Sequence, residues 1–301
     1  MNHVGFDAAR RRLLAALAGT AAGIASAQPP SGLLRPIPAS GERIPAIGVG
    51  SWLTFNAPDA RTLAPVLQRF FDGGGTLIDS SPMYGRAETV IGELLALTAR
   101  RERAFAATKI WTPGRALGLA QLERSLRLWG LERLDLVQVH NLVDWPTHLA
   151  ALREQRAAGR VRYLGLTTSH GRRHDEMERA LTRERVDVAQ FTYSLADRSA
   201  EQRLLPLCAE RGIAVIANRP FDGGDLFNVV RGRPLPAWAR EFGAANWAQF
   251  FLKFIVSHPA VTCAIPATSN PAHMAENIGA LHGRLPDADL RRRMAQHVGA
   301  L

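Results

Sequence analysis

The tripeptide LID at residues 77–79 runs directly into SSPMYG at residues 80–85, so a buried strand ends in a turn at this point. The apolar residues before Asp79 are typical of a short buried strand, and the serines, proline and glycine after it are typical of a turn. Asp79 is therefore expected at the carboxyl tip of a strand, with Tyr84 on the loop that follows. By itself the stretch fits equally well a structural aspartate that binds turn amides and a tyrosine packed on a loop.

The pattern of an apolar strand followed by a helix recurs along the chain. Short apolar runs lie at 44–52, 76–79, 104–111, 134–140, 161–167, 186–193, 213–218 and 261–267. Segments with helical spacing follow them at 60–72, 87–98, 116–129, 147–158, 174–184, 200–211, 244–257 and 272–281. Apolar strands that alternate with helices predict a parallel sheet covered by helices, and eight such units in about 240 residues predict a closed (β/α)8 TIM barrel. A doubly wound open sheet is the rival, but no Gly-x-Gly-x-x-Gly motif follows the first strand.

The residues before 44 do not fit the barrel pattern. Residues 9–28, ARRRLLAALAGTAAGIASAQ, have the arginines, the small-residue apolar run and the ASA site of a secretory signal, with cleavage expected before Gln28. A frayed amphipathic helix is the alternative. The arginines followed by two leucines resemble the twin-arginine export signal, which predicts the export machinery as a partner and a periplasmic location. The apolar run is too short for a stable membrane span.

The chain therefore divides into three predicted parts. Residues 1–27 are the export signal peptide, 28–43 a lead-in segment or short hairpin, and 44–301 the barrel domain. Within the barrel domain, residues 287–298 are expected to form a C-terminal capping helix on the outside. The longest interruption, 219–243, follows the seventh strand, and a loop of that length is usually functional or mobile.

Composition and charge narrow the classes of protein. The chain has 301 residues, of which 47% are hydrophobic and 21% charged, as in ordinary globular proteins. Its net charge of +10 is carried by arginine, because Lys109 and Lys253 are the only lysines. The arginines are scattered and the aromatic residues do not interleave with them, so we expect a basic surface and no nucleic-acid partner. Cys208 and Cys263 lie far apart and are expected to be buried thiols rather than a disulfide or a metal site.

The tips of adjacent strands carry residues that can do chemistry. Asp79 ends the second strand, Lys109 ends the third and His140 ends the fourth, with Tyr84 on the loop after the second. The carboxyl ends of the strands meet at one face of a parallel barrel, where active sites lie, so we expect these four side chains to be close together. A lysine at the end of an apolar strand is costly unless it is paired. We therefore expect a site with a small-molecule partner.

Four stretches resemble the signatures of the aldo-keto reductases. They are Asp79 with the SSPMYG.AE..IGE that follows it (80–93), TKIW (108–111), VQVHN (137–141) and AIPATSNPAHMAENIGAL (264–281). The resemblance extends from about Ile44 to the C-terminus, and it implies a (β/α)8 barrel that binds a nicotinamide dinucleotide at its carboxyl-terminal face. It also implies a catalytic tetrad of Asp79, Tyr84, Lys109 and His140. Tyr84 would be the general acid, Lys109 would lower its pKa, Asp79 would hold Lys109, and His140 would orient the carbonyl group.

The resemblance also implies a cofactor site. Its residues in this chain would be Thr167, Thr168, Gln190, Asn218, Arg219, Thr268, Glu276 and Asn277. Gln190 corresponds to the family glutamine that binds the nicotinamide carboxamide, Thr167 and Thr168 replace a Ser-Asn pair, and Asn218 replaces the aromatic residue that stacks on the ring. NADP(H) is expected rather than NAD(H). Ala267 and His273 stand where many members carry the lysine and arginine for the 2′-phosphate, and Arg219, Arg231 or Arg233 are candidate replacements.

Trp52 and Trp111 are expected to wall an apolar substrate pocket. The function predicted is reduction of aldehydes or ketones by hydride transfer from NAD(P)H, with Tyr84 as proton donor. Two other functions stay open: a catalytically idle subunit of the same fold that senses a cofactor, and a non-redox barrel enzyme such as a lyase or isomerase. The complete tetrad favours the reductase.

Overall fold

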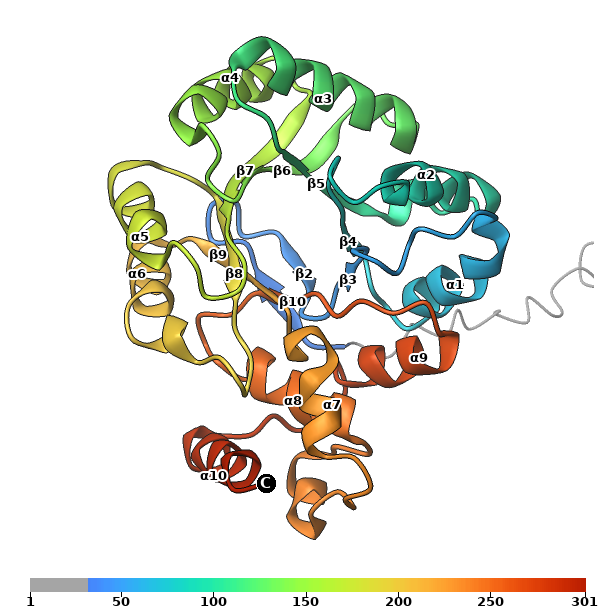
Figure 1. The fold of residues 1–301 in the computed structure, drawn as a ribbon, viewed down its shortest axis with the longest axis vertical. Coiled ribbons are helices and arrows are strands. Elements are labelled where there is room, and N and C mark those ends of the chain that lie inside the picture. The colour runs from blue at the N-terminus through green and yellow to red at the C-terminus, as the bar shows by residue number, and fades with distance from the viewer. Residues whose placement is uncertain (1–31) are drawn as a thin grey trace, which may run out of the picture.

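The structure is a computed structural model that describes residues 32–301, so the predicted export signal at 1–27 lies outside the described residues. Eight parallel strands stand side by side in chain order around a barrel (Figure 1). They are β3 (Val49–Gly50), β4 (Leu77–Asp79), β5 (Phe105–Ile110), β6 (Leu134–His140), β7 (Val161–Thr167), β8 (Val188–Thr192), β9 (Ala214–Asn218) and β10 (Cys263–Ala264). Parallel bridges from Ile47 to Ala264 and from Gly50 to Ala267 join the first strand to the last. The predicted (β/α)8 barrel is confirmed.

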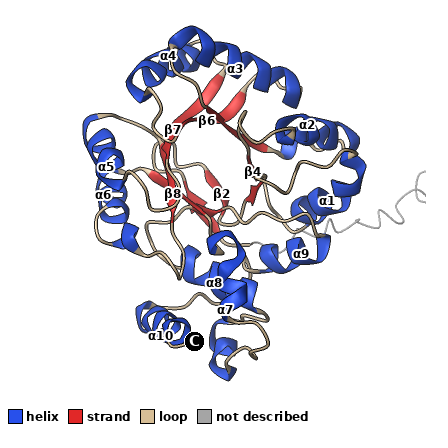
Figure 2. Cartoon of the chain, viewed as in Figure 1, coloured by secondary structure: helices blue, strands red, loops and turns tan. Residues whose placement is uncertain are grey.

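Helices cover the outside of the barrel, as Figure 2 shows. They are α1 (Ala64–Asp72), α2 (Ala87–Leu97), α3 (Arg115–Trp129), α4 (Trp145–Ala157), α5 (His174–Arg183), α6 (Leu204–Arg211), α8 (Trp247–Val256) and α9 (Pro271–Gly279). Helix α1 illustrates why they pack there: Val66, Leu67, Phe70 and Phe71 form one apolar stripe and are fully buried. The strands are buried on both faces, which explains their near-continuous apolar sequences.

The N-terminal hairpin closes the amino-terminal end of the barrel. Strand β1 (Leu34–Pro36) pairs antiparallel with β2 (Arg43–Pro45). Ile37 and Ile44 pack in one apolar cluster with inward-facing residues from seven of the barrel strands: Leu77, Phe105, Ala107, Leu136, Tyr163, Val188, Ala214, Ile216 and Cys263. The predicted short hairpin is thus present, but it takes residues 44–45 from the first predicted strand. That strand was placed at 44–52, and in the structure it is divided between β2 and the short β3.

The segment between β9 and α8 is not a plain loop. It contains the short helices η4 (Asp222–Gly224), α7 (Asp225–Val229) and η5 (Ala237–Phe242). Trp238 of η5 lies edge-on to Phe250 of α8 and to His297 of α10 (Ala288–Gly299), with ring centroids 5.6 and 5.7 Å apart. The predicted C-terminal helix is present, and it packs outside the ring of helices beside α8 (Figure 1). Burial of aromatic residues far apart in sequence therefore holds this segment in place.

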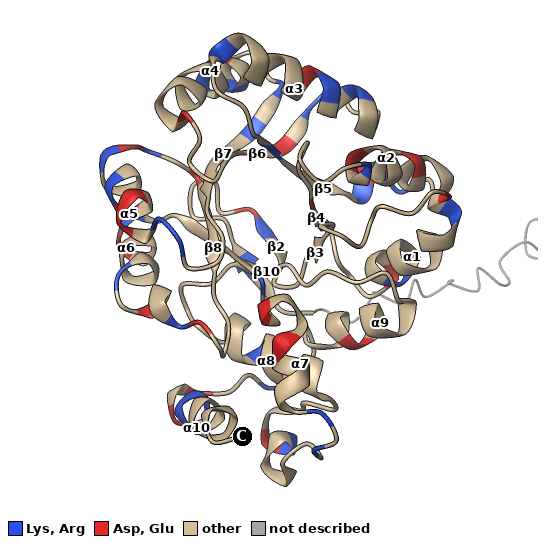
Figure 3. Ribbon diagram, in the orientation of Figure 1, with Lys and Arg blue, Asp and Glu red and all other residues tan. Residues whose placement is uncertain are grey.

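Basic residues are spread around the outer helices, with acidic residues among them (Figure 3). Both lysines are buried: Lys109 lies in the barrel, and Lys253 of α8 donates to the carbonyl groups of His282 and Arg284 at 2.5 and 3.1 Å. Burial lowers the pKa of Lys253 to about 8. Within residues 32–301, no helix has the length and apolar character that crossing a membrane requires.

Candidate active site

A cavity of about 700 Å³ opens at the carboxyl ends of the strands. Asp79, Tyr84 and His140 line it, while Lys109 lies behind them in the barrel. A second hollow of about 740 Å³ lies at the opposite, amino-terminal end, beneath the hairpin. Arg162 in its lining is paired with Glu42 and Asp135, and none of the predicted site residues lines it. Chemistry rather than size therefore identifies the first cavity as the site.

The site residues continue the inward-facing rows of the strands. Successive residues of a strand point to opposite faces, so Asp79 follows Leu77, Lys109 follows Ala107, and Gln190 follows Val188 on the same face. These rows are apolar near the hairpin and polar at the other end. In the sheet register Lys109 lies opposite Gln138, and Thr167 lies opposite Gln190. The backbone thus brings together side chains that are far apart in the sequence.

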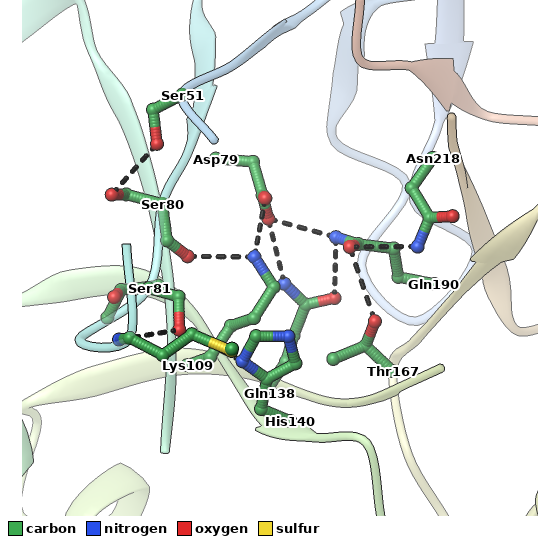
Figure 4. A network of polar contacts seen from close by, with 12 residues as sticks. Ser51, Asp79, Ser80, Ser81, Lys109, Gln138, His140, Thr167, Gln190 and Asn218 are labelled. Atoms are coloured by element: carbon green, nitrogen blue, oxygen red, sulfur yellow. Dashed lines mark hydrogen bonds and ion pairs between the residues drawn. The ribbon is translucent and has the colours of Figure 1, made fainter. Parts of the chain in front are cut away.

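Asp79 and Lys109 form a buried ion pair (Figure 4). The Lys109 ammonium donates to Oδ2 of Asp79 at 2.5 Å and to the carbonyl oxygen of Ser80 at 2.8 Å. The two side chains are almost completely shielded from solvent. Burial acts to lower the pKa of Lys109, but attraction to the Asp79 carboxylate opposes it, and the pKa is raised above its ordinary value. Lys109 is therefore a fixed positive charge.

Tyr84 lies next to this charge. The Lys109 Nζ atom is 4.9 Å from the centre of the Tyr84 ring, and the ring meets that of His140 edge-on at 5.7 Å. Burial raises the pKa of Tyr84, the Lys109 charge opposes that rise, and the Asp79 charge adds to it. The predicted effect of Lys109 thus has the expected sign, but the net pKa of Tyr84 is raised rather than lowered. The reason is that burial destabilises the phenolate more than the Lys109 ammonium, which is already paired with Asp79, stabilises it. Tyr84 consequently keeps its proton.

His140 is neutral. Burial and the positive charge of Lys109 lower the pKa of its ring to about 2. Its Nδ1 atom is 2.9 Å from the hydroxyl oxygen of Ser81, a residue that the sequence analysis did not single out. A neutral imidazole has one N–H donor and one acceptor nitrogen, so this contact bears on which nitrogen faces the cavity.

A network of amides extends from Asp79 toward the predicted cofactor residues (Figure 4). Oδ1 of Asp79 accepts from Nε2 of Gln138 at 3.1 Å and from Nε2 of Gln190 at 2.9 Å. Oε1 of Gln190 in turn accepts from Oγ1 of Thr167 at 3.2 Å and from Nδ2 of Asn218 at 3.3 Å. Gln138 was missed by the sequence analysis, although a glutamine two residues before His140 in an otherwise apolar strand was the signal for it.

The structure places the other predicted cofactor residues in two groups. Thr168 and Arg219 line the cavity, and each has a buried polar atom, Oγ1 and Nε, with no hydrogen-bond partner among residues 32–301. Thr268, Glu276 and Asn277 are not among the residues that line the cavity. They lie at α9 and the turn before it, where Oγ1 of Thr268 accepts from the backbone N–H of Asn270 at 3.0 Å.

Of the two tryptophans predicted to wall the pocket, the structure places only one at the cavity. Trp52 lines the cavity and is 44% exposed at its mouth. Trp111 is not among the lining residues, and its backbone N–H and carbonyl are both held by the side chain of Gln121. Phe221 and Phe227 line the cavity instead, and their rings pack on each other with centroids 4.8 Å apart. The spacing of the 219–243 segment carried no signal for these two residues, because their position depends on how η4 and α7 fold back.

Comparisons with known proteins identify the family of the chain. Residues 46–295 match the sequence profile of a family described as the aldo/keto reductase family. The chain is 30% identical over 255 residues to the methylglyoxal reductase YeaE of Escherichia coli K12, a match that covers 82% of this chain and 89% of the relative. It is 25% identical to the NADH-specific methylglyoxal reductase of the same strain, over 83% of this chain and 94% of the relative.

Solved structures are similar as well. An aldo/keto reductase from Klebsiella pneumoniae, solved in complex with NADP and acetate, superimposes with a TM-score of 0.70 at 26% identity and covers 86% of this chain and 93% of its own. The holo form of an aldo-keto reductase from Bacillus halodurans has a TM-score of 0.75 at 21% identity, covering 89% of this chain and 96% of its own. The second likeness concerns the fold alone.

Proposed function

The chain belongs to the aldo/keto reductase family, and from that premise we propose that it reduces an aldehyde or ketone to an alcohol with Tyr84 as the proton donor. Family membership makes the protein an NAD(P)H-dependent oxidoreductase. One observation carries the assignment of the proton donor: the phenol ring of Tyr84 lines the cavity 4.9 Å from the buried, Asp79-bound ammonium of Lys109.

Reduction requires a hydride at the carbonyl carbon and a proton at its oxygen. When bound, the nicotinamide supplies the hydride. The phenol of Tyr84 gives its proton to the oxygen, which becomes strongly basic as the hydride arrives, and the Lys109 ammonium stabilises the phenolate that remains. Asp79 keeps that ammonium charged and in place. Neutral His140 holds the carbonyl oxygen by a hydrogen bond.

The cavity offers groups that fit a nicotinamide dinucleotide. Thr168 and Arg219 line a cavity large enough for a cofactor, and the buried Thr168 hydroxyl and Arg219 Nε atom lack partners within the described part of the chain. Gly223 and Gly224 also line it, and their φ angles of +72° and +110° favour glycine at both positions. Because glycine has no side chain, a phosphate could approach their backbone closely. We propose that Thr167, Gln190 and Asn218 complete this site and that Thr268, Glu276 and Asn277 contribute from its edge.

NADP(H) is the proposed cofactor. The Klebsiella structure holds NADP, whereas one relative is named NADH-specific. Arg219 supports NADP(H) because it is the one of the three candidate arginines that lines the cavity, where Asp222 and His170 hold its guanidinium at 3.0 and 2.9 Å. Arg231 and Arg233 are not among the lining residues; Arg233 donates to the carbonyl of Leu301 and Arg231 to the side chain of Asn228. Comparing the Kd values for NADPH and NADH in the same buffer tests this choice.

The mouth of the cavity favours substrates with apolar parts. Trp52, Leu53 and Met83 line it and are each at least partly exposed. An exposed apolar rim at a concave site binds apolar or aromatic groups. Methylglyoxal, which names two of the relatives, is a reasonable first compound for an assay, followed by a panel of aromatic aldehydes and ketones.

A direct test measures cofactor binding by fluorescence and then turnover of the carbonyl panel. Tyr84→Phe should bind the cofactor as the wild type does and lose about 10²–10⁴-fold in rate, because it removes only the proton donor. Tyr163→Phe is the matched control, since Tyr163 lies at the amino-terminal end of the barrel and its hydroxyl bonds Ser40 and Glu42. Binding of the cofactor without turnover of any carbonyl would instead favour the idle, cofactor-sensing subunit.

We also propose that the export machinery recognises residues 9–28 and delivers the protein to the periplasm. Support comes only from the sequence ARRRLLAALAGTAAGIASAQ, which lies outside the described residues. Replacing Arg10, Arg11 and Arg12 with lysine should leave the protein in the cytoplasm. Cell fractionation of the triple variant tests this, and unchanged export would contradict the proposal.

A further inference from the structure

We propose that Ser81 is a positioning residue that fixes His140 as the tautomer with its proton on Nε2. Ser81 lies on the loop directly after β4, and His140 ends β6, so the barrel brings the two together from separate strands. Figure 4 shows Ser81 beside the His140 ring, and the Ser81 hydroxyl oxygen is 2.9 Å from Nδ1. Both residues are buried, with 1% and 5% of their surface exposed.

The direction of this hydrogen bond follows from counting protons. Within residues 32–301 the Ser81 hydroxyl oxygen has one other partner, the backbone N–H of Met83 at 3.3 Å, and that group is a donor. The hydroxyl hydrogen therefore has Nδ1 of His140 as its acceptor. If Nδ1 carried the proton and donated to Ser81, the hydroxyl hydrogen would be buried without an acceptor, at a cost of about 1–3 kcal/mol. Ser81 consequently donates, and Nδ1 accepts.

The ring of His140 then has a single place for its own proton. The burial of the ring and the positive charge of Lys109 keep His140 neutral, so the ring carries one N–H. With Nδ1 occupied as an acceptor, that N–H is Nε2–H. His140 lines the cavity and its ring meets Tyr84 edge-on at 5.7 Å, and none of the described residues bonds Nε2. The Nε2–H of His140 is thus a hydrogen-bond donor in the same part of the cavity as the Tyr84 hydroxyl.

The consequence for the reaction rests on the proposed function. A carbonyl oxygen can only accept hydrogen bonds, so it is held by Nε2–H and repelled by an unprotonated Nε2. As the hydride adds to carbon, the oxygen gains negative charge and takes the proton of Tyr84, while His140 keeps its own proton and stabilises that charge. Ser81 itself touches neither substrate nor cofactor. It acts by choosing which nitrogen of His140 is the donor.

Nitrogen-15 NMR tests the tautomer without substrate or cofactor. In protein labelled with ¹⁵N-histidine, the His140 ring should show an unprotonated Nδ1 and a protonated Nε2, and the His140→Ala variant identifies its signals among the nine histidines. Ser81→Ala should convert this pattern to a mixture of tautomers, and Ser81→Thr, which keeps the hydroxyl, should preserve it. Ser80→Ala is the matched control, because its buried hydroxyl bonds Ser51 and not His140. A protonated Nδ1 in the wild type, or an unchanged pattern in Ser81→Ala, would overturn the proposal.

Kinetics test the consequence separately. Removing an oxyanion donor typically costs about 10²–10³-fold in rate, so Ser81→Ala, which only loosens the tautomer, should lose about 10-fold in kcat/KM at saturating cofactor. Its Kd for NADPH should match the wild type, and Ser81→Thr should recover most of the rate. A correct tautomer in a protein that reduces no carbonyl compound would refute the proposed function and leave the role of Ser81 intact. Wild-type kcat/KM in Ser81→Ala, with its tautomers mixed, would instead refute the link between tautomer and rate.

Discussion

Substituting either Asp79 or Lys109 should lower the free energy of unfolding, and the contacts of the two side chains predict which substitution lowers it more. The Asp79 carboxylate accepts from three side-chain donors: Nζ of Lys109 and the Nε2 atoms of Gln138 and Gln190. The Lys109 ammonium has two acceptors, Asp79 and the carbonyl of Ser80. Removing one partner of a buried pair costs about 3–5 kcal/mol, because it leaves an uncompensated charge.

The two single variants should therefore differ. Lys109→Met leaves the carboxylate with two amide donors, so its loss should lie near the lower limit, about 3 kcal/mol. Asp79→Asn leaves the ammonium without a counter-charge, and when Oδ1 still accepts from Gln138 and Gln190 the new Nδ2 group places a donor against the ammonium, so its loss should lie near about 5 kcal/mol. The double variant removes both charges, and its loss should be smaller than the sum by about 2–3 kcal/mol.

Urea unfolding of the four proteins measures this coupling, with equal m-values as the check that each unfolds in the same way. The pH dependence of the reduction rate in the same variants shows how the Lys109 charge acts on Tyr84. Lys109 opposes the rise in the pKa of Tyr84, so Lys109→Met should raise that pKa further and move the alkaline loss of reduction to higher pH. Additive losses of stability, or an alkaline limb that moves to lower pH in Lys109→Met, would refute the reasoning.

Three further outcomes are expected. The pKa of His140 is lowered to about 2 in the fold, so its contribution to stability is complete above its ordinary value near 6.5 and is lost as the pH falls below it. His140→Asn should remove this decline in the free energy of unfolding, which is about 1.4 kcal/mol per pH unit between pH 6 and 4. Urea unfolding at several pH values measures it, and an equal dependence on pH in the wild type and the variant would argue against it. Arg219→Gln should raise the Kd for NADPH about 10-fold, seen by fluorescence titration, with Arg240→Gln on η5, outside the cavity, as the unaffected control. Arg291→Met should lower the free energy of unfolding by about 2–4 kcal/mol, since its guanidinium bonds Glu201 and Tyr193 and covers Phe254; a change within 0.5 kcal/mol would contradict this.

The alternation of strands and helices, and the residues at the strand tips, could be predicted from the sequence because both depend on local rules. A parallel strand buried on both faces must be apolar along its length, so each strand is visible as a short run. Polar residues that interrupt or end such runs stand out for the same reason, as Asp79, Lys109 and His140 do. The barrel closes with all carboxyl ends at one face, and that topology brings the strand tips together whatever the details of packing.

Only the tertiary structure decided what surrounds those side chains. The net rise in the pKa of Tyr84 comes from its burial against the core of the folded barrel. The contact of Ser81 with His140 joins the loop after β4 to the end of β6, two strands that are not neighbours in the sheet. Trp111 has the same exposure as Trp52 within about one per cent, yet only Trp52 lines the cavity. The spacing of apolar residues along the chain indicates which side chains face the core. Which partner each of them meets there depends on how the loops fold back over the barrel, and that depends on contacts between residues far apart in the sequence.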